Sequence, residues 1–189
     1  PKNRLKIDES LERFSLTKPQ ARVYSAFYGL QEIPCAEGLS MVELITRSVE
    51  DLLQKAIIDK QHIKYLIHSH TAKVITRFGR SVIREVQQVL GLTSAIAFGT
   101  SLNNCASTLN AFEMAEALLQ AHDEQARAIV VTGERAFTPT VQVIPNTSIT
   151  GDASSAVLVG LHGKNHRLIH QKMRMAGEFY RGIWLTPIE

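Results

Sequence analysis

The sequence predicts an α/β fold with a mostly parallel, mixed sheet and flanking helices. Short apolar runs of strand length alternate along the chain with amphipathic patterns of helical period. Such alternation is typical of parallel sheets, in which a helix crosses back over the sheet to the next strand. Polar residues follow several of the apolar runs. Because ligands bind outside the carboxyl ends of parallel strands, we expect these polar residues to gather at one edge of the sheet.

Composition restricts the class of protein. A chain of 189 residues with 44% hydrophobic and 21% charged residues predicts one globular domain with its own core. The apolar runs are too short to cross a bilayer, and the polar first residues lack a signal-peptide pattern. Two cysteines, Cys35 and Cys105, imply no disulfide framework, so we expect a cytoplasmic protein without a membrane partner.

The charge pattern argues against nucleic-acid binding. The formal net charge is +3, and the basic residues form only short groups, such as those within 164–167 and 172–174. Scattered charge of this kind is weak evidence for a nucleic-acid partner. It is compatible with an acidic protein partner, with a phosphate-bearing substrate, or with a solvated surface.

The first 37 residues are weakly patterned. We expect a short helix over 7–14, an aromatic-rich run over 23–30 that turns at Gly29, and a loop or extended chain over 33–35. A clear helix begins after Ser40, which forms an S-x-x-E capping box with Glu43.

The next segments alternate as the fold class requires. A buried strand is expected over 63–67, and a second amphipathic helix over 80–90, ended by Gly91. An apolar run over 95–98 then leads through a polar turn to Cys105, after which apolar residues recur at helical spacing to Leu119.

Cys105 therefore falls where a buried strand passes into a helix. Free N–H groups and the positive end of the helix dipole favour a thiolate at such a position. The pattern predicts a nucleophilic cysteine at the helix N-terminus. The alternative is an inert, buried thiol that packs as a small hydrophobe.

Three further segments complete the chain. A strand is expected over 128–132, followed by a long polar loop over 135–150. Gly151 and Asp152 form a turn in which the carboxylate caps backbone N–H groups, and a strand follows over 153–161. Residues 167–175 alternate in polarity and predict one more strand.

The order of these segments resembles the N-terminal half of a β-ketoacyl-acyl-carrier-protein synthase III, in the thiolase superfamily. The motifs that carry the resemblance are LNNCAST at 102–108 against "AACSG", VVTGER at 130–135 against "VVGSE", TGDASSAVL at 150–158 against "FGDGAGAVVL", and Leu90-Gly91 before the next strand. The resemblance extends over nearly the whole chain and implies the N-terminal half of a thiolase-like fold.

The resemblance also implies an activity. It makes Cys105 the nucleophile that takes an acyl group from a thioester of coenzyme A or phosphopantetheine, for Claisen condensation with a unit on acyl carrier protein. As neighbours of the cysteine in sequence or at the sheet edge, Asn104, Ser107 and His70 are the expected substrate contacts. The resemblance further implies acyl-CoA and acyl carrier protein as partners, no permanently bound cofactor, and a homodimer paired through residues 95–101.

Two departures from the family qualify this expectation. The family's C-terminal half, with its histidine and asparagine, lies outside these residues, so we expect residues 1–189 to form one half-domain, either a piece of a longer chain or a subunit. Gln31 to Pro34 replace the family's basic loop for coenzyme A phosphates. The alternative function is therefore a non-catalytic partner subunit of a ketosynthase.

His68 and His70 allow two other interpretations. Two residues apart on extended chain, they share a face and resemble a metal pair, but two ligands are too few, so no metal site is expected. A cysteine-dependent hydrolase with either histidine as base is the remaining possibility. A serine hydrolase is not expected, because Ser107 lacks a G-x-S-x-G frame.

Overall fold

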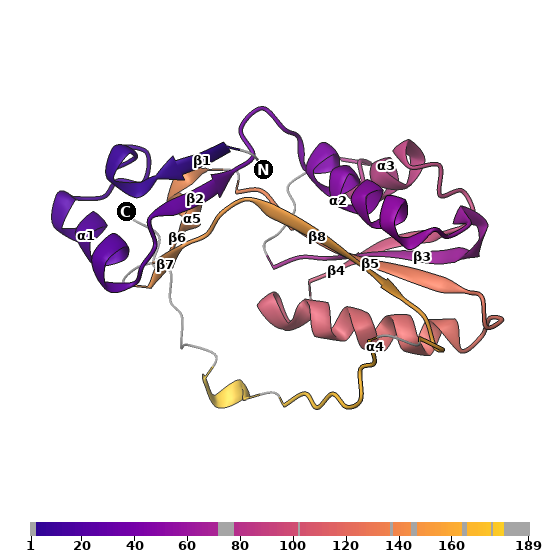
Figure 1. The fold of residues 1–189 in the computed structure, drawn as a ribbon. Coiled ribbons are helices and arrows are strands. Elements are labelled where there is room, and N and C mark those ends of the chain that lie inside the picture. The colour runs from indigo at the N-terminus through magenta and orange to yellow at the C-terminus, as the bar shows by residue number, and fades with distance from the viewer. Residues whose placement is uncertain are drawn as a thin grey trace.

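The structure is a computed structural model, and we describe its residues 3–71, 78–101, 103–136, 138–144, 147–163, 166–174 and 176–179. Figure 1 shows a three-layer α/β body joined to a smaller body of short strands and helical turns. The elements in chain order are β1 (Asn3–Lys6), η1 (Ile7–Glu9), α1 (Lys18–Arg22), η2 (Val23–Phe27), β2 (Glu32–Cys35), α2 (Met41–Ala56), η3 (Lys60–His62), β3 (Ile63–Ser69), α3 (Val82–Val89), β4 (Ile96–Thr100), η4 (Asn104–Ala106), α4 (Ser107–Leu119), β5 (Arg127–Glu134), α5 (Pro139–Gln142), β6 (Val143–Ile144), β7 (Ser148–Ile149), β8 (Ala153–Val159) and η5 (Gly177–Phe179).

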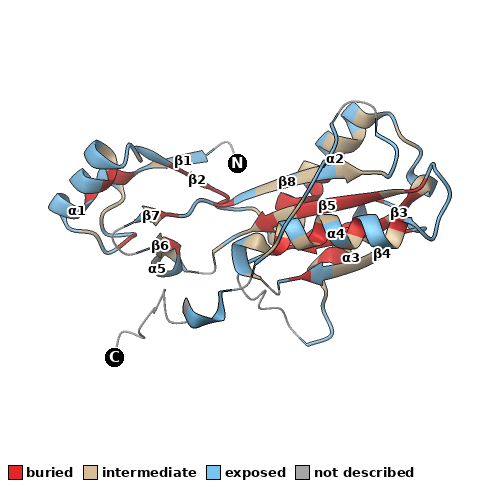
Figure 2. Ribbon diagram, turned by 90° about the horizontal axis from the view of Figure 1, so that it is seen from below, coloured by how far each residue is buried: buried red, intermediate tan, exposed pale blue. Residues whose placement is uncertain are grey.

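The larger body contains a four-stranded mixed sheet in the order β4-β3-β5-β8. Strands β4, β3 and β5 are parallel, and β8 pairs antiparallel to β5. The inner strands β3 and β5 are almost wholly buried (Figure 2). The outer strands β4 and β8 consist mainly of exposed and half-buried residues. The predicted fold class, a mostly parallel mixed sheet with flanking helices, is confirmed.

Helices cover both faces of this sheet (Figure 1). On one face α2 and α3 bury an aliphatic cluster that includes Ile45, Val86 and Leu66. On the other face α4 packs through Ala111 and Ala115 against alternate residues of β3 and β5. Small alanine side chains on α4 let the helix approach the sheet closely, because little side-chain volume separates the two backbones.

The smaller body has its own apolar cluster. Strands β1 and β2 pair antiparallel, and their inward side chains pack with those of α1, η2 and the short β6–β7 pair. Ile7, Phe14 and Ile33 are the large buried side chains of this cluster.

Asp152 ties the two bodies together. Its buried carboxylate accepts one hydrogen bond from the backbone N–H of Ala36 at 2.9 Å and another from that of Ala136 at 3.2 Å. The Asp152 backbone N–H donates to the Pro34 carbonyl at 3.0 Å. The sequence-based prediction that Asp152 caps backbone N–H groups is confirmed, but the N–H groups it caps belong to distant segments and not to the local turn that was expected.

The strongest sequence signals match the structure closely. The capping box before α2 is present, with the Glu43 N–H donating to Ser40 Oγ at 3.1 Å and the Ser40 N–H donating to Glu43 Oε2 at 2.7 Å. That backbone donor, with the Ser40 hydroxyl, holds the pKa of Glu43 below its ordinary value.

Weaker signals led to wrong or incomplete predictions. The expected helix over 7–14 is only the 3₁₀ turn η1. Of the two alternatives for 33–35, loop or extended chain, the structure shows extended chain, which pairs as part of β2. The expected strand over 167–175 is also wrong, because the described residues 166–174 form no strand and do not join the sheet. Met175 lies outside the described residues.

Within the described residues, no helix combines the length and the apolar character needed to cross a membrane. Cys35 is buried in β2 and Cys105 is exposed, and both are free thiols.

Replacing Asp152 with alanine should destabilise the fold. The change leaves the N–H groups of Ala36 and Ala136 without their acceptor, which should lower the free energy of unfolding by about 2 to 4 kcal/mol. Urea denaturation measures the difference, with Asp8→Ala at an exposed carboxylate as the control. A loss no larger than that of the control would contradict the role of Asp152 in joining the two bodies.

Candidate active site at the start of helix α4

The carboxyl ends of the three parallel strands meet beside the start of α4. Ser69 at the end of β3 lies opposite Thr100 of β4 and Thr132 of β5 in the strand register. The Ser69 hydroxyl is also 3.0 Å from the Thr108 hydroxyl in the first turn of α4. This hydrogen bond anchors the N-terminal end of the helix over the end of the sheet.

A tight turn positions Cys105 between β4 and α4. Asn104 has a left-handed backbone, with φ of 48°, and begins the 3₁₀ turn η4. Asparagine adopts this conformation more readily than most residues. Cys105 is the next residue, its side chain is exposed, and α4 begins two residues later at Ser107. The predicted place of Cys105, at a strand-to-helix junction, is confirmed, but the strand is not buried as expected, because β4 is exposed or half-buried except at Thr100.

Ser107 fixes the turn from its buried side. Its side chain is only 1% exposed, and its hydroxyl accepts a hydrogen bond from the Asn103 backbone N–H at 3.2 Å. The Ala106 N–H donates to the Asn103 carbonyl at 2.9 Å. Ser107 thus holds the chain that precedes Cys105, and its hydroxyl is directed toward that chain, whereas the sequence predicted a substrate contact.

His68 is a buried residue of the sheet. Its Nε2 is 2.9 Å from the Gly133 carbonyl oxygen, so Nε2 carries the proton and donates it. Burial lowers the pKa of His68 below 6.5, and the neighbouring His70 acts in the same direction, while the Gly133 carbonyl opposes the shift. The neutral imidazole is therefore the form that the fold favours.

His70 lies just beyond β3 and stacks against His68, with ring centroids 4.8 Å apart. Its backbone N–H donates to the Thr100 carbonyl at 3.1 Å, which extends the pairing of β3 with β4. The next residue, Thr71, donates its N–H to the Glu134 carboxylate at the end of β5. The expected gathering of these segments at one sheet edge is therefore confirmed for His68, His70 and Glu134.

The catalytic alternatives involving histidine receive no support from these contacts. Within the described residues the Cys105 thiol makes no hydrogen bond to either imidazole. In that same part of the chain, no three His, Cys, Asp or Glu side chains lie close enough together to hold a metal ion.

The sequence carries no signal that Met173 is a neighbour of the Cys105 turn. Met173 lies with its sulfur 3.3 Å from Asn103 Nδ2, and Gln171 donates through Nε2 to the Leu109 carbonyl at 3.0 Å. Gln171 and Met173 thus lie against the first turn of α4 and the turn that carries Cys105. The alternating polarity that suggested a strand instead matches half-buried Gln171 and Met173 between exposed neighbours.

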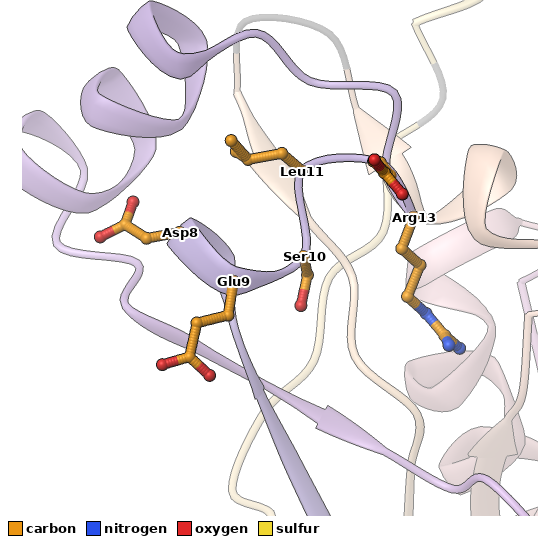
Figure 3. A pocket seen from close by; sticks show the side chains of 6 residues that line it. Asp8, Glu9, Ser10, Leu11 and Arg13 are labelled. Atoms are coloured by element: carbon orange, nitrogen blue, oxygen red, sulfur yellow. The ribbon is translucent and has the colours of Figure 1, made fainter.

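Two cavities formed by described residues lie away from Cys105. One, of about 450 Å³, is lined by residues 8–13 of the smaller body (Figure 3). The other, of about 720 Å³, follows the groove between α2 and β8. In Figure 3 the carboxylates of Asp8 and Glu9 extend away from Arg13 and Leu11, so the first cavity has no converging set of catalytic groups.

No protein-family model matches this chain, and no curated protein matches it either. Solved structures do match. An acyltransferase, ChlB3, aligns with a TM-score of 0.73 at 15% identity, over 85% of this chain and 47% of its own. The 3-oxoacyl-[acyl-carrier-protein] synthase III from Aquifex aeolicus VF5 aligns with a TM-score of 0.68 at 18% identity, over 87% of this chain and 51% of its own.

The chain has a thiolase-like half-fold. MvaS, solved in complex with 3-hydroxy-3-methylglutaryl coenzyme A, aligns with a TM-score of 0.66 at 19% identity, over 85% of this chain and 37% of its own. The resemblance to the N-terminal half of the synthase III family is thereby confirmed as a likeness of fold. The chain spans about half or less of the length of these three structures.

The buried His68 should make stability depend on pH. In the folded chain its pKa lies below 6.5, so on acidification the unfolded chain takes up this proton first. Stability should therefore fall as the pH drops through and below 6.5. Urea denaturation across that range should show a weaker pH dependence for His68→Gln than for the natural sequence.

The comparison concerns the slope with pH, because His68→Gln also removes packing and shifts the absolute stability. His166→Gln, a change at an exposed side chain, is the matched control. Equal slopes for His68→Gln and the natural sequence would contradict a neutral, buried His68.

Proposed function

We propose that this chain is the cysteine-bearing half of a condensing acyltransferase of the ketoacyl synthase III type. The observation that carries the proposal is the exposed thiol of Cys105, in the tight turn between β4 and α4 of a thiolase-like half-fold. The thiolate is the nucleophilic form of a cysteine, so the proposal requires Cys105 to react in that form.

The first chemical step under this proposal is acyl transfer. The Cys105 sulfur attacks the thioester carbonyl carbon and forms a C–S bond, which gives a tetrahedral oxyanion. The oxyanion collapses, the bond to the departing thiol breaks, and the coenzyme A or pantetheine thiolate leaves and takes a proton. Backbone N–H groups in the first turn of α4 are the nearest candidates to stabilise the oxyanion.

The second step is a Claisen condensation on a carrier-bound acceptor, and it requires groups that we assign to the rest of the enzyme. Asn104, exposed beside the cysteine, and His70, at the sheet edge, are the proposed substrate contacts. Ser107 is proposed to act on substrate binding indirectly, because its hydroxyl holds the turn that carries Cys105 and Asn104. Coenzyme A and phosphopantetheine thioesters are the proposed substrates, with no resident cofactor and no metal.

A homodimer is part of the proposal. Among the described residues, strand β4 is an edge of the sheet, and an edge strand has backbone groups open for pairing. Its Ile96 side chain is 62% exposed on this edge. A second copy of β4 placed beside the first would continue the sheet across the dimer. The proposed setting is the cytoplasm.

The proposal predicts an acyl adduct on one cysteine. Incubation of the intact protein with a panel of acyl-CoA thioesters should add the mass of the acyl group, and peptide mapping should place it on Cys105. Cys105→Ala should abolish the adduct, and Cys35→Ala, the control, should retain it because Cys35 is buried. No adduct across the panel, or an adduct that persists in Cys105→Ala, would defeat the proposal.

The same variant distinguishes the proposed catalytic function from the alternative, a non-catalytic partner subunit. In the assembled enzyme, Cys105→Ala should lower turnover by about a thousandfold or more if the thiol is the nucleophile. A non-catalytic subunit would leave turnover unchanged.

A further inference from the structure

Asn103 stands at the start of the turn that carries Cys105, in the position of a helix cap. The turn η4 covers Asn104–Ala106. An asparagine in this position ordinarily accepts a hydrogen bond, through its side-chain oxygen, from the second or third backbone N–H that follows. Among the described residues, the Asn103 side chain makes no cap bond of this kind, and it donates instead through Nδ2 to the Met173 sulfur at 3.3 Å.

The capped turns elsewhere in the chain provide a comparison. The side chains of Thr17, Ser40 and Asp59 each accept a hydrogen bond from a backbone N–H two or three residues later. Their backbones are extended, with ψ between 125° and 163°, whereas ψ of Asn103 is 36°. Both the backbone and the side chain of Asn103 are therefore held away from the arrangement of a cap.

The donor that an Asn103 cap would take is the backbone N–H of Cys105. The N–H of Ala106, the third donor of the turn, already bonds to the Asn103 carbonyl at 2.9 Å. The second donor, that of Cys105, belongs to the same residue as the attacking sulfur. A backbone N–H directed at a developing oxyanion stabilises it, and the same N–H bonded to a side chain would not.

We propose that Met173 is a positioning residue for acyl transfer. Its sulfur holds the Asn103 amide out of the cap position and so keeps the Cys105 N–H for the carbonyl of the thioester. The inference rests on the proposed function, under which Cys105 is the acyl acceptor.

The segment that carries Met173 is attached beside the turn. Gln171 donates through Nε2 to the Leu109 carbonyl of α4 at 3.0 Å, and both Gln171 and Met173 are half-buried while Lys172 between them is exposed. Two contacts thus fix the place of the sulfur. A thioether is a weak acceptor, so its contact orients the Asn103 amide and adds little to stability. Loss of the sulfur should therefore alter acyl transfer more than folding.

Acylation of the intact protein by p-nitrophenyl acetate tests the inference, with the rate of Cys105→Ala subtracted. The Cys105 sulfur attacks the ester carbonyl carbon and a C–S bond forms. The bond to p-nitrophenolate then breaks, and the thiol proton passes to solvent. Met173→Leu keeps the apolar bulk and removes the sulfur, so it should slow the release of p-nitrophenolate by about tenfold or more. Alkylation by iodoacetamide forms no oxyanion and should keep its natural rate. Equal acylation rates for Met173→Leu and the natural sequence would overturn the proposal.

A double variant separates positioning from packing. Asn103→Ala has no side chain that could cap the turn, so Met173→Leu added to Asn103→Ala should cause no further slowing. Equal slowing in both backgrounds would mean that Met173 acts through packing, and would overturn the proposal. Met41→Leu, at a half-buried methionine of α2, is the matched control and should be acylated at the natural rate. If Met173→Leu does not fold, norleucine in place of methionine replaces the sulfur with a methylene and should slow acylation only when Asn103 is present.

Failure of the proposed function has a different signature. Cys105 would then be acylated by p-nitrophenyl acetate, with the same dependence on Met173 and Asn103, and by no acyl-CoA thioester. Acylation by acyl-CoA that is unchanged in Met173→Leu would overturn this inference and leave the proposed function intact. Acylation of the natural sequence by p-nitrophenyl acetate no faster than that of Cys105→Ala would also overturn the inference.

Discussion

The turn between β4 and α4 constrains the rest of the site. Three parallel strands end side by side, and the chain leaving the edge strand must reverse direction within a few residues to begin a helix packed on the same sheet. The left-handed backbone of Asn104 makes that reversal possible. Cys105 lies in the 3₁₀ turn η4 and Ser107 begins α4, so their side chains leave the backbone in different directions. Cys105 is consequently exposed while Ser107 is buried.

Contacts from distant segments keep this turn in place. Thr108 is tied to Ser69 at the end of β3, and Asn103 is held by Ser107 on one side and Met173 on the other. These hydrogen bonds hold the backbone of the turn in one conformation, which apolar packing alone would not do. These contacts therefore fix the start of α4 against the sheet end, and Met173 lies against the turn that precedes Cys105.

The sequence predicted the elements that carry strong local signals. The capping box of Ser40 and Glu43, the buried runs of β3 and β5, and the amphipathic pattern after Cys105 depend on neighbouring residues alone, and all three have their expected form. The expected helix over 7–14 was wrong, because the Ile7 N–H bonds to the Gln31 carbonyl beside the β1–β2 pair and the helical turn ends at Glu9. The role of Met173 was unpredictable, since its contact with Asn103 joins residues 70 positions apart. Polarity that alternates along 167–175 fits a strand and a segment lying on a helix equally well.

The central claim is that the fold presents the Cys105 thiol to solvent at the start of α4 while it buries Cys35. Alkylation with iodoacetamide under native conditions, followed by peptide mapping over time, tests that claim most directly. The account predicts rapid modification of Cys105 in the native protein, with Cys35 modified only after unfolding in urea. Modification of Cys105 only after unfolding, or at the same native rate as Cys35, would contradict it.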